Sequence, residues 1–236
     1  VIYFMIMHPT AGDGGIAVDN FRWIVDLVWL AATAGTRAGM MDYNAREEIL
    51  PAEAHVLVLF ATSGMMILAA ARDLTIVFLG IELMSIAVYI LTGMNRRSEK
   101  SAEGAIKYFL LGAFSTGFLL YGIALVYGAT GTTSLTLIGE RVAANQIMSA
   151  PMLLIGIGLM LIGFGFKVAL APFHMWAPDV YEGAPTPITA YMAAAVKAAA
   201  GAAGRRVSLA AFAGEIPRGH IAMWWLAAAT MVVGNL

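Results

Sequence analysis

Three ionisable side chains stand inside long apolar stretches of this sequence. Glu82 lies in IVFLGIELM, Lys167 in GFGFKVAL and Lys197 in AAAVKAAA. A charge at the centre of a membrane-spanning helix costs about 2.5–3.5 kcal/mol even on insertion scales, so such residues face one another or water and commonly mark ion paths. In low-dielectric surroundings, desolvation disfavours the charged form of a lysine and a nearby carboxylate favours it. A change in the balance between these two effects lets the lysine release or take up a proton. We therefore expect Glu82, Lys167 and Lys197 to form a proton path.

A structural interpretation of the same residues stays open. Glu82 and Lys167 would then form a fixed ion pair, while Lys197 extends its amine to a membrane interface. In favour of the functional interpretation, both cations are lysines. An arginine would stay protonated throughout, whereas a lysine can release its proton.

A broken helix follows Lys167. Pro172 and Pro178 each remove a backbone donor and disfavour continued helix. Interrupted helices inside membranes are typical of ion sites in transporters. His174, two helical turns beyond Lys167, is a candidate proton relay at neutral pH. The alternative is an interfacial histidine packed beside Trp176.

Four other charged residues have simpler interpretations. Asp179 and Glu182 are expected to cap or brace the helix that follows them. Glu103 and Lys107 are spaced i,i+4 near a helix start, which predicts a local ion pair. Lys107 at the mouth of a proton path is the alternative.

The composition indicates that the elements carrying these residues are membrane helices. The chain has 236 residues, 60% hydrophobic and 12% charged, and its mean hydropathy is +0.79. An ordinary soluble domain carries about 25% charged residues, so a water-soluble enzyme is excluded. With no cysteine, the chain has no disulfide, thiolate zinc site or cysteine-ligated iron–sulfur cluster. The formal net charge of −1 argues against a nucleic-acid partner.

Apolar stretches long enough to cross a bilayer predict a helical bundle. A hydrocarbon core about 30 Å thick needs about 20 helical residues. We predict an all-α polytopic transmembrane bundle, one membrane domain over residues 1–236, with spans at 54–71, 74–94, 105–130, 152–173, 188–204 and 221–236, the last incomplete. A weaker segment at 21–35 is either a span or an interfacial helix. Both ends are expected to be edges of a longer subunit.

Three motifs carry a family resemblance. They are Leu79-Gly80-Ile81-Glu82-Leu83-Met84-Ser85, Lys107-Tyr108-Phe109-Leu110-Leu111-Gly112-Ala113-Phe114-Ser115, and the stretch from Phe164 to Ala195 with Pro172-Phe173-His174-x-Trp176-x-Pro178-Asp179-Val180-Tyr181-Glu182-Gly183-Ala184-Pro185-Thr186-Pro187. Over roughly residues 42–236 the chain closely resembles the antiporter-like subunit N family of respiratory complex I. Sister subunits and multisubunit sodium/proton antiporters share the glutamate and lysine but usually lack Tyr-Glu-Gly-Ala-Pro. Residues 201–218 depart from the family pattern.

The resemblance implies a fourteen-helix antiporter-like fold that carries no redox group and moves protons. Glu82 matches the family's glutamate of the fifth helix, Lys167 the lysine of the broken seventh, and Lys197 the central lysine of the eighth. A further lysine on a broken twelfth helix has no counterpart in this sequence. No cofactor or metal is expected in this chain. NADH, FMN, iron–sulfur clusters and quinone are expected in partner subunits, and the partners are the other membrane subunits of the complex, including sister antiporter-like subunits.

Three functions fit these features. The first is a translocase subunit of proton-pumping NADH:quinone oxidoreductase, the second a subunit of a multisubunit cation/proton antiporter, and the third a structural membrane subunit whose charges only pair. Spans rich in alanine and glycine favour a bacterial inner membrane, with organelle membranes as the alternative.

Overall fold

The computed structural model describes residues 14–49 and 51–233, with side chains for all of these except 51 and 215–222. The elements along the chain are α2 (Asn20–Arg46), α3 (Pro51–Ala70), α4 (Leu74–Thr92), α5 (Glu99–Thr130), α6 (Leu135–Ala143), α7 (Ala150–Val168), α8 (Ala177–Gly183), α9 (Thr186–Tyr191), the π-helix η1 (Met192–Val196), α10 (Lys197–Ala211), the 3₁₀ turn η2 (Ala213–Glu215) and α11 (Ile216–Val233). Extended backbone within the described ranges forms only two isolated bridges. The predicted all-α class is confirmed.

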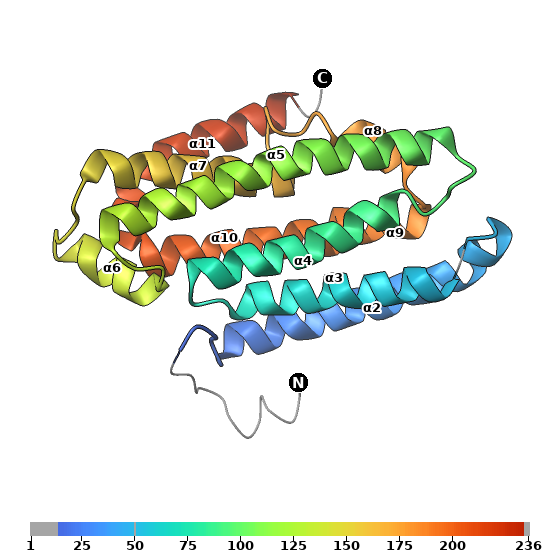
Figure 1. The fold of residues 1–236 in the computed structure, drawn as a ribbon, viewed down its shortest axis with the longest axis horizontal. Helices are drawn as coiled ribbons and strands as arrows, with labels where there is room; N and C mark the ends of the chain where they lie inside the picture. The colour runs from blue at the N-terminus through green and yellow to red at the C-terminus, as the bar shows by residue number, and fades with distance from the viewer. Residues whose placement is uncertain (1–13, 50, 234–236) are drawn as a thin grey trace.

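Within residues 14–49 and 51–233, four helices are long and apolar enough to cross a membrane. They are Ala52–Ala70, Leu74–Thr92, Glu99–Thr130 and Ala150–Val168. In addition, α9, η1 and α10 follow one another without interruption from residue 186 to residue 211. All these rods run along the long axis of the molecule (Figure 1). This arrangement is the bundle expected of a polytopic membrane protein.

Helix α2 covers the segment at 21–35, which the sequence predicts to be either a span or an interfacial helix. It covers 27 residues, well beyond residue 35, and packs along α3. It is not among the four helices that satisfy the length and hydropathy required of a span.

Small residues let the long helices approach closely. A Cβ at Gly64 of α3 would lie 2.5 Å from the Met84 backbone nitrogen, and one at Gly80 of α4 would lie 3.0 Å from the Leu68 nitrogen. Helices α5 and α7 cross in the same way, because a Cβ at Gly122 would lie 2.7 Å from the carbonyl oxygen of Gly156. Close backbone approach is the usual means of helix association in lipid.

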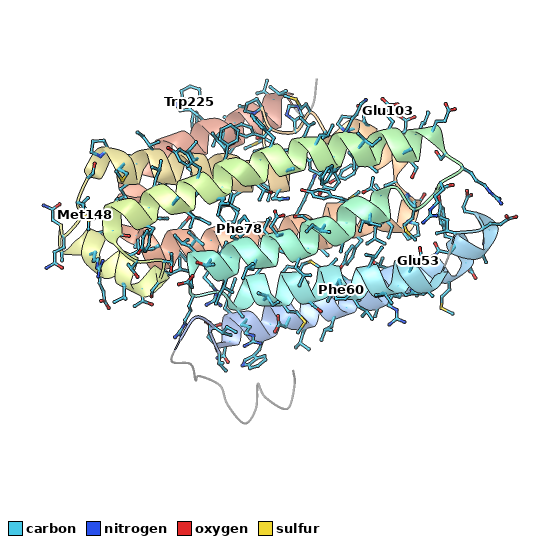
Figure 2. All side chains as sticks on the ribbon, viewed as in Figure 1. Glu53, Phe60, Phe78, Glu103, Met148 and Trp225 are labelled. Atoms are coloured by element: carbon cyan, nitrogen blue, oxygen red, sulfur yellow. The ribbon has the colours of Figure 1, made fainter. Side chains whose placement is uncertain are left out.

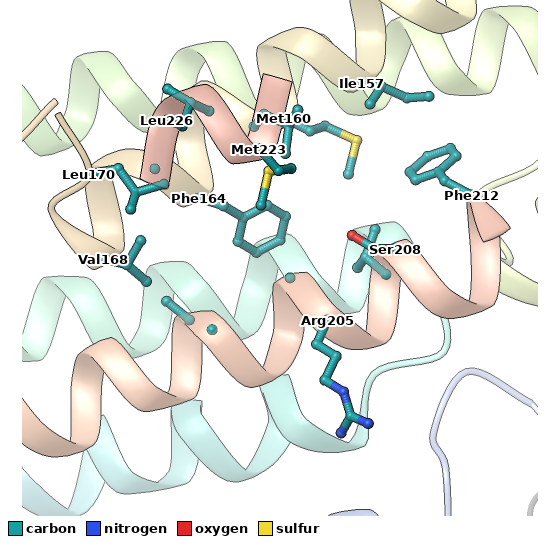
Figure 3. Close-up of a pocket in the computed structure, with 16 residues that line it drawn as sticks. Ile157, Met160, Phe164, Val168, Leu170, Arg205, Ser208, Phe212, Met223 and Leu226 are labelled. Carbon is teal, nitrogen blue, oxygen red and sulfur yellow. The ribbon is translucent and has the colours of Figure 1, made fainter. Parts of the chain in front are cut away.

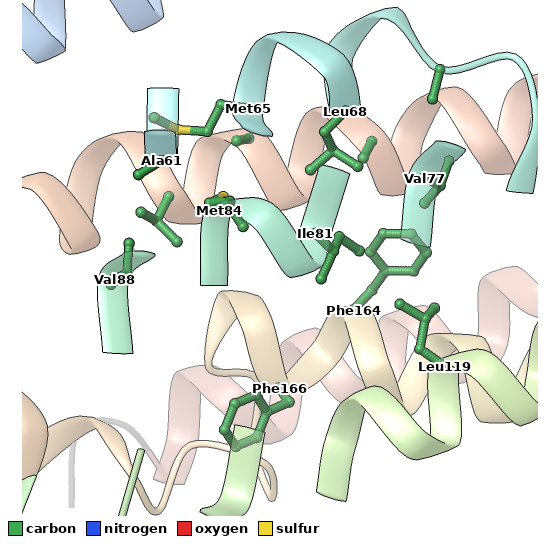
Figure 4. Close-up of a cluster of buried hydrophobic side chains, with 14 of the residues drawn as sticks. Ala61, Met65, Leu68, Val77, Ile81, Met84, Val88, Leu119, Phe164 and Phe166 are labelled. Carbon is green, nitrogen blue, oxygen red and sulfur yellow. The ribbon is translucent and has the colours of Figure 1, made fainter. Parts of the chain in front are cut away.

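The core lies between the α3–α4 pair and the α5–α7 pair. Figure 4 shows Met65 and Leu68 of α3 facing Ile81 and Met84 of α4, with Phe164 of α7 on the other side. The four aliphatic side chains are 0% exposed. Large apolar side chains such as Phe60 are about half exposed and point outward, as lipid-facing residues do (Figure 2).

The helix predicted over 152–173 ends earlier than residue 173. Helix α7 ends at Val168, and Ala169 adopts a left-handed conformation with φ 57°. Pro172 lies four residues beyond Val168, so its ring would clash with the Val168 carbonyl and it offers no N–H to that carbonyl. The chain then turns through residues 169–176 to α8, and the Ala171–Pro172 bond is cis.

Other helices extend beyond their predicted ends. Helix α5 begins at Glu99 rather than residue 105, because Ser98 caps it by accepting from the Ser101 N–H. The helical rod expected over 188–204 covers 186–211. The final helix, expected over 221–236, begins at Ile216 and is described to Val233.

Candidate functional site

Lys167 lies in the last turn of α7, buried among hydroxyl groups and aromatic rings. Its side chain belongs to a residue only 2% exposed. The Nζ donates to Ser85 Oγ at 2.7 Å and to the Tyr89 hydroxyl at 2.9 Å. It also lies 5.3 Å from the Tyr89 ring centroid and 5.8 Å from that of Phe166. The described partners of this amine are therefore neutral.

One face of α4 supplies those partners. Glu82, Ser85 and Tyr89 are spaced i, i+3 and i+7, so they line up along a single side of the helix. The Ser85 hydroxyl itself donates to the Ile81 carbonyl at 2.5 Å, which leaves its oxygen free to accept from Lys167. Sequence reasoning identified Glu82 but missed Ser85 and Tyr89. The signal that could have found them is this polar stripe on an otherwise apolar helix.

Gly112 of α5 makes room for the Tyr89 hydroxyl. A Cβ at position 112 would fall on that hydroxyl and would lie 2.6 Å from Tyr89 Cζ. The Tyr89 ring is held on its other sides by Tyr108 and Phe109, with centroids 4.7 and 5.9 Å away, both edge-on. The ring is therefore fixed where Lys167 can reach its oxygen.

Glu82 does not pair with Lys167 in this structure. Its Oε1 is buried and has no hydrogen-bond partner among the described residues, and no ion pair within 4.0 Å joins the two side chains. The residue is partly buried, one helical turn from Ser85. A fixed Glu82–Lys167 ion pair, the structural interpretation of these charges, is thus not what the side chains form here.

Lys197 stands at the junction of the π-helix and α10. Its backbone N–H donates to the Met192 carbonyl, five residues back, as well as to that of Ala194. Single π turns inside helices occur frequently at functional sites. The Nζ lies over the Tyr181 ring of α8, 5.1 Å from the centroid, and within the described ranges it forms no ion pair. The residue is partly buried.

His174 lies apart from the two lysines. It sits in the turn between α7 and α8 and lines a largely apolar hollow with Pro172, Phe173 and Trp225 of α11. Its Nδ1 is buried without a hydrogen-bond partner among the residues described. No described hydrogen bond or ion pair connects it to Lys167 or Lys197.

A second hollow, of about 280 Å³, lies between α7, α10 and α11 (Figure 3). Phe164 and Met223 project into it, and its polar lining is confined to Arg205 and Ser208. The hollow lacks the ionisable residues of the proposed path.

Ion pairs at one end of the bundle hold α8 against α5. Lys107 Nζ lies 2.6 Å from Asp179 Oδ2 and 2.6 Å from Glu103 Oε1, so the predicted Glu103–Lys107 pair is confirmed and Asp179 joins it. Lys100 pairs with Glu182. The expectation that Asp179 and Glu182 brace the following helix was wrong, because these acids instead bind the preceding lysines on α5.

At the other end, Asp19 joins α2 to α10. It caps α2 by accepting from the Arg22 N–H at 2.8 Å, and it receives two bonds from Arg206, at 2.8 and 2.9 Å. Burial alone would raise the pKa of Asp19, but the hydrogen bonds from Arg206 and from the Arg22 backbone outweigh it and lower the pKa below its usual 3.8.

Comparison with known proteins places this arrangement in a family. Residues 71–236 match the family model described as NADH:quinone oxidoreductase/Mrp antiporter, TM. The chain belongs to this family. The matched residues include Glu82, Lys167 and Lys197.

Relatives within the NADH:quinone oxidoreductase/Mrp antiporter family support the resemblance to subunit N. The chain is 55% identical over 224 residues to NADH-quinone oxidoreductase subunit N of Gemmatimonas aurantiaca, covering 95% of this chain and 43% of that protein. The chain therefore spans less than half the length of that curated relative.

Solved structures agree on the fold. A chain of respiratory complex I from Thermus thermophilus with bound aureothin is 40% identical with a TM-score of 0.72, and the match covers 84% of this chain and 42% of that one. A chain of the Mrp complex from Dietzia sp. is 21% identical with a TM-score of 0.68, covering 85% of this chain and 36% of that one, and shows the fold alone. The antiporter-like bundle with its broken helix is confirmed.

Proposed function

We propose that this chain is part of a non-redox membrane subunit of NADH:quinone oxidoreductase that translocates protons through Glu82, Lys167 and Lys197. Quinone reduction in partner subunits would drive the transfer. The identity to curated subunit N supports the membership. The observation that carries the mechanism is the setting of Lys167, buried inside a bundle of spanning helices and bonded to two neutral hydroxyls rather than to a carboxylate.

Neutral partners suit a group that changes its protonation state. A serine or tyrosine hydroxyl accepts from an ammonium and can rotate to donate to a neutral amine. An approaching Glu82 carboxylate would favour the ammonium, and its withdrawal would favour release, because the two charges interact strongly in a low-dielectric interior. Lys197 would take up the released proton along the membrane midplane. His174 remains a relay candidate, separate from this chain of residues.

The partners and cofactors follow from the same proposal. NADH, FMN, the iron–sulfur clusters and quinone would bind to partner subunits, and this chain would contact other membrane subunits, including sister antiporter-like subunits. We place the complex in a bacterial inner membrane, with an organelle membrane as the alternative. In such an assembly the chain's own residues hold and move protons and take no part in electron transfer.

The deciding experiment replaces Lys167 in the full-length subunit of the intact complex. Lys167→Met complexes, reconstituted in vesicles, are expected to lose most proton pumping per electron while NADH:quinone electron transfer continues at a measurable rate. Arg97→Met is the matched control, because its side chain is 72% exposed and pairs at the surface with Glu48, away from α8. Full pumping by the Lys167→Met complex would refute the mechanism.

The family model also covers Mrp antiporters, which keeps a multisubunit cation/proton antiporter as the second candidate. Copurification of the full-length subunit with peripheral redox subunits favours the first function. Sodium-dependent proton exchange in vesicles without NADH favours the second. Under the structural alternative, Glu82→Gln would leave pumping intact and weaken assembly.

A further inference from the structure

A continuous row of aromatic rings connects the surroundings of Lys167 to those of Lys197. Tyr89, which accepts from Lys167, packs edge-on against Tyr108. Tyr108 stacks on Trp176 with centroids 4.5 Å apart, and Trp176 meets Tyr181 edge-on at 5.7 Å. Tyr181 is the ring beneath the Lys197 amine.

The row is anchored to the backbone beside Lys167. Trp176 is 2% exposed, and its indole N–H donates to the Phe166 carbonyl at 3.1 Å. Phe166 immediately precedes Lys167 and packs against Trp176 at 5.5 Å between centroids. A displacement of the end of α7 would therefore be transmitted through Trp176 to its neighbour Tyr181.

The helix that carries Tyr181 packs against α5. Helix α8 is tied to α5 by the Lys107–Asp179 and Lys100–Glu182 ion pairs. A Cβ at Gly104 of α5 would lie 3.2 Å from the Asp179 carbonyl oxygen, so the two backbones pack closely. The contacts between α8 and α5 thus help to hold the Tyr181 ring beside Lys197.

Tyr181 offers its ring rather than its hydroxyl. The hydroxyl is buried and has no hydrogen-bond partner among the described residues. Lys197 has no described carboxylate partner either, so the ring face is the group placed to stabilise its ammonium. A cation over an aromatic face is attracted by the ring quadrupole, and more strongly where water is excluded.

We propose that Tyr181 is a positioning residue that holds the Lys197 ammonium on its ring face, and that Trp176 couples this ring to the backbone beside Lys167. The proposal rests on the proton-transfer function proposed above. Under it, the two lysines communicate through packed rings as well as through charge. The position of Lys197 then depends on the position of the end of α7.

The test varies the electron density of the ring without changing its shape. Phenylalanine, 4-fluorophenylalanine and 3,4,5-trifluorophenylalanine are introduced at position 181 of the full-length subunit in the intact complex. Proton pumping per electron is expected to be close to wild type with phenylalanine and to fall in steps, by about 5- to 30-fold in total, as fluorine withdraws the ring charge. The melting temperature of the complex should fall in the same order. The same series at Tyr127, which is 54% exposed, is the control and should be flat.

A second series separates a contact with Lys197 from a general packing role. In a Lys197→Met background the fluorinated rings should change neither the residual pumping nor the melting temperature, because the cation is gone. A flat series in the wild-type background would overturn the proposal, and so would a graded fall that persists in the Lys197→Met background. If Lys197→Met itself pumps normally, the proposed function fails, while the melting temperatures still decide whether Tyr181 binds the ammonium.

Discussion

Adding one methyl group at Gly112 should disconnect Lys167 from Tyr89. The new Cβ of Gly112→Ala would fall on the Tyr89 hydroxyl and lie 2.6 Å from Cζ and 3.0 Å from Cε1. Ordinary carbon contacts are about 3.5–4.0 Å, so the ring must retreat by about 1 Å. Phe109 and Tyr108 already pack against it, which limits the directions it can take.

Two costs oppose one gain in this variant. Crowding a packed interior costs about 1–3 kcal/mol. A retreat of the hydroxyl stretches its 2.9 Å bond from Lys167, and a hydrogen bond to a charged group contributes about 1.5–3 kcal/mol. Replacing a helical glycine by alanine returns only about 1 kcal/mol. The clash therefore dominates, and loss of the bond alone corresponds to a change of about 10- to 150-fold in the fraction of Lys167 held in place.

The measurement is proton pumping per electron by the intact complex in vesicles, with assembly followed by native electrophoresis. Gly112→Ala should reduce pumping by about tenfold or more in the complexes that assemble. Gly117→Ala adds the same methyl to α5 where nothing lies within 4 Å, and should pump normally. Gly122→Ala crowds the Gly156 backbone without contacting Lys167, and should reduce the amount of assembled complex rather than its pumping. Equal pumping by the Gly112→Ala and Gly117→Ala complexes would refute the reasoning.

Two further predictions concern the polar contacts that join other helices. Hydrogen bonds from Arg206 overcome the effect of burial and lower the pKa of Asp19, so this pair should stabilise the subunit by about 1–2 kcal/mol above pH 4 and lose that contribution as the pH falls through the lowered pKa. Melting of the complex at several pH values should show Asp19→Asn less stable than wild type at pH 7, with the difference shrinking as the pH falls below about 4, and a constant difference would contradict this origin. Thr62, 3% exposed, bonds the Tyr191 hydroxyl at 2.8 Å. Thr62→Val should destabilise the complex by about 0.6–2 kcal/mol, whereas Ser63→Ala on the exposed face should be neutral, and equal melting temperatures would count against the network.

The helices could be predicted because the bilayer imposes a simple length and polarity requirement. The ends of the helices were harder, since they depend on single backbone contacts. Pro172 indicated a break, but the helix ends four residues earlier, at Val168, because the proline ring acts on the carbonyl one turn back. Nothing local distinguishes the π-helix in MAAAV from ordinary helix, so the register of Lys197 could not be predicted from sequence.

The charged residues of the candidate site stand out in the sequence, and the bonds they form do not. Glu82 and Lys167 attract attention because charge in an apolar run is costly. Ser85 and Tyr89 share a polar stripe with Glu82, but their bonds to Lys167 appear only once the register of α4 against α7 is known. The same holds for Tyr181, whose ring meets Lys197 through the path of α8. Tertiary packing, rather than composition, selects these partners.

Two hydroxyl partners affect the protonation of Lys167 differently from a carboxylate partner. A buried lysine locked to a carboxylate keeps its proton, because separating the charges in low dielectric is expensive. Hydroxyls from Ser85 and Tyr89 bond either form of the amine, so exchange of the proton leaves no donor or acceptor stranded. The last turn of α7 adds partial negative charge at the helix end, which favours the ammonium without fixing it to one site. Glu82 lies one helical turn from Ser85. Under the proposed function, a small movement of α4 against α7 would therefore shift Lys167 between its protonated and neutral forms. For that reason the proposed function requires Glu82 and Lys167 to be near each other but not paired in this state.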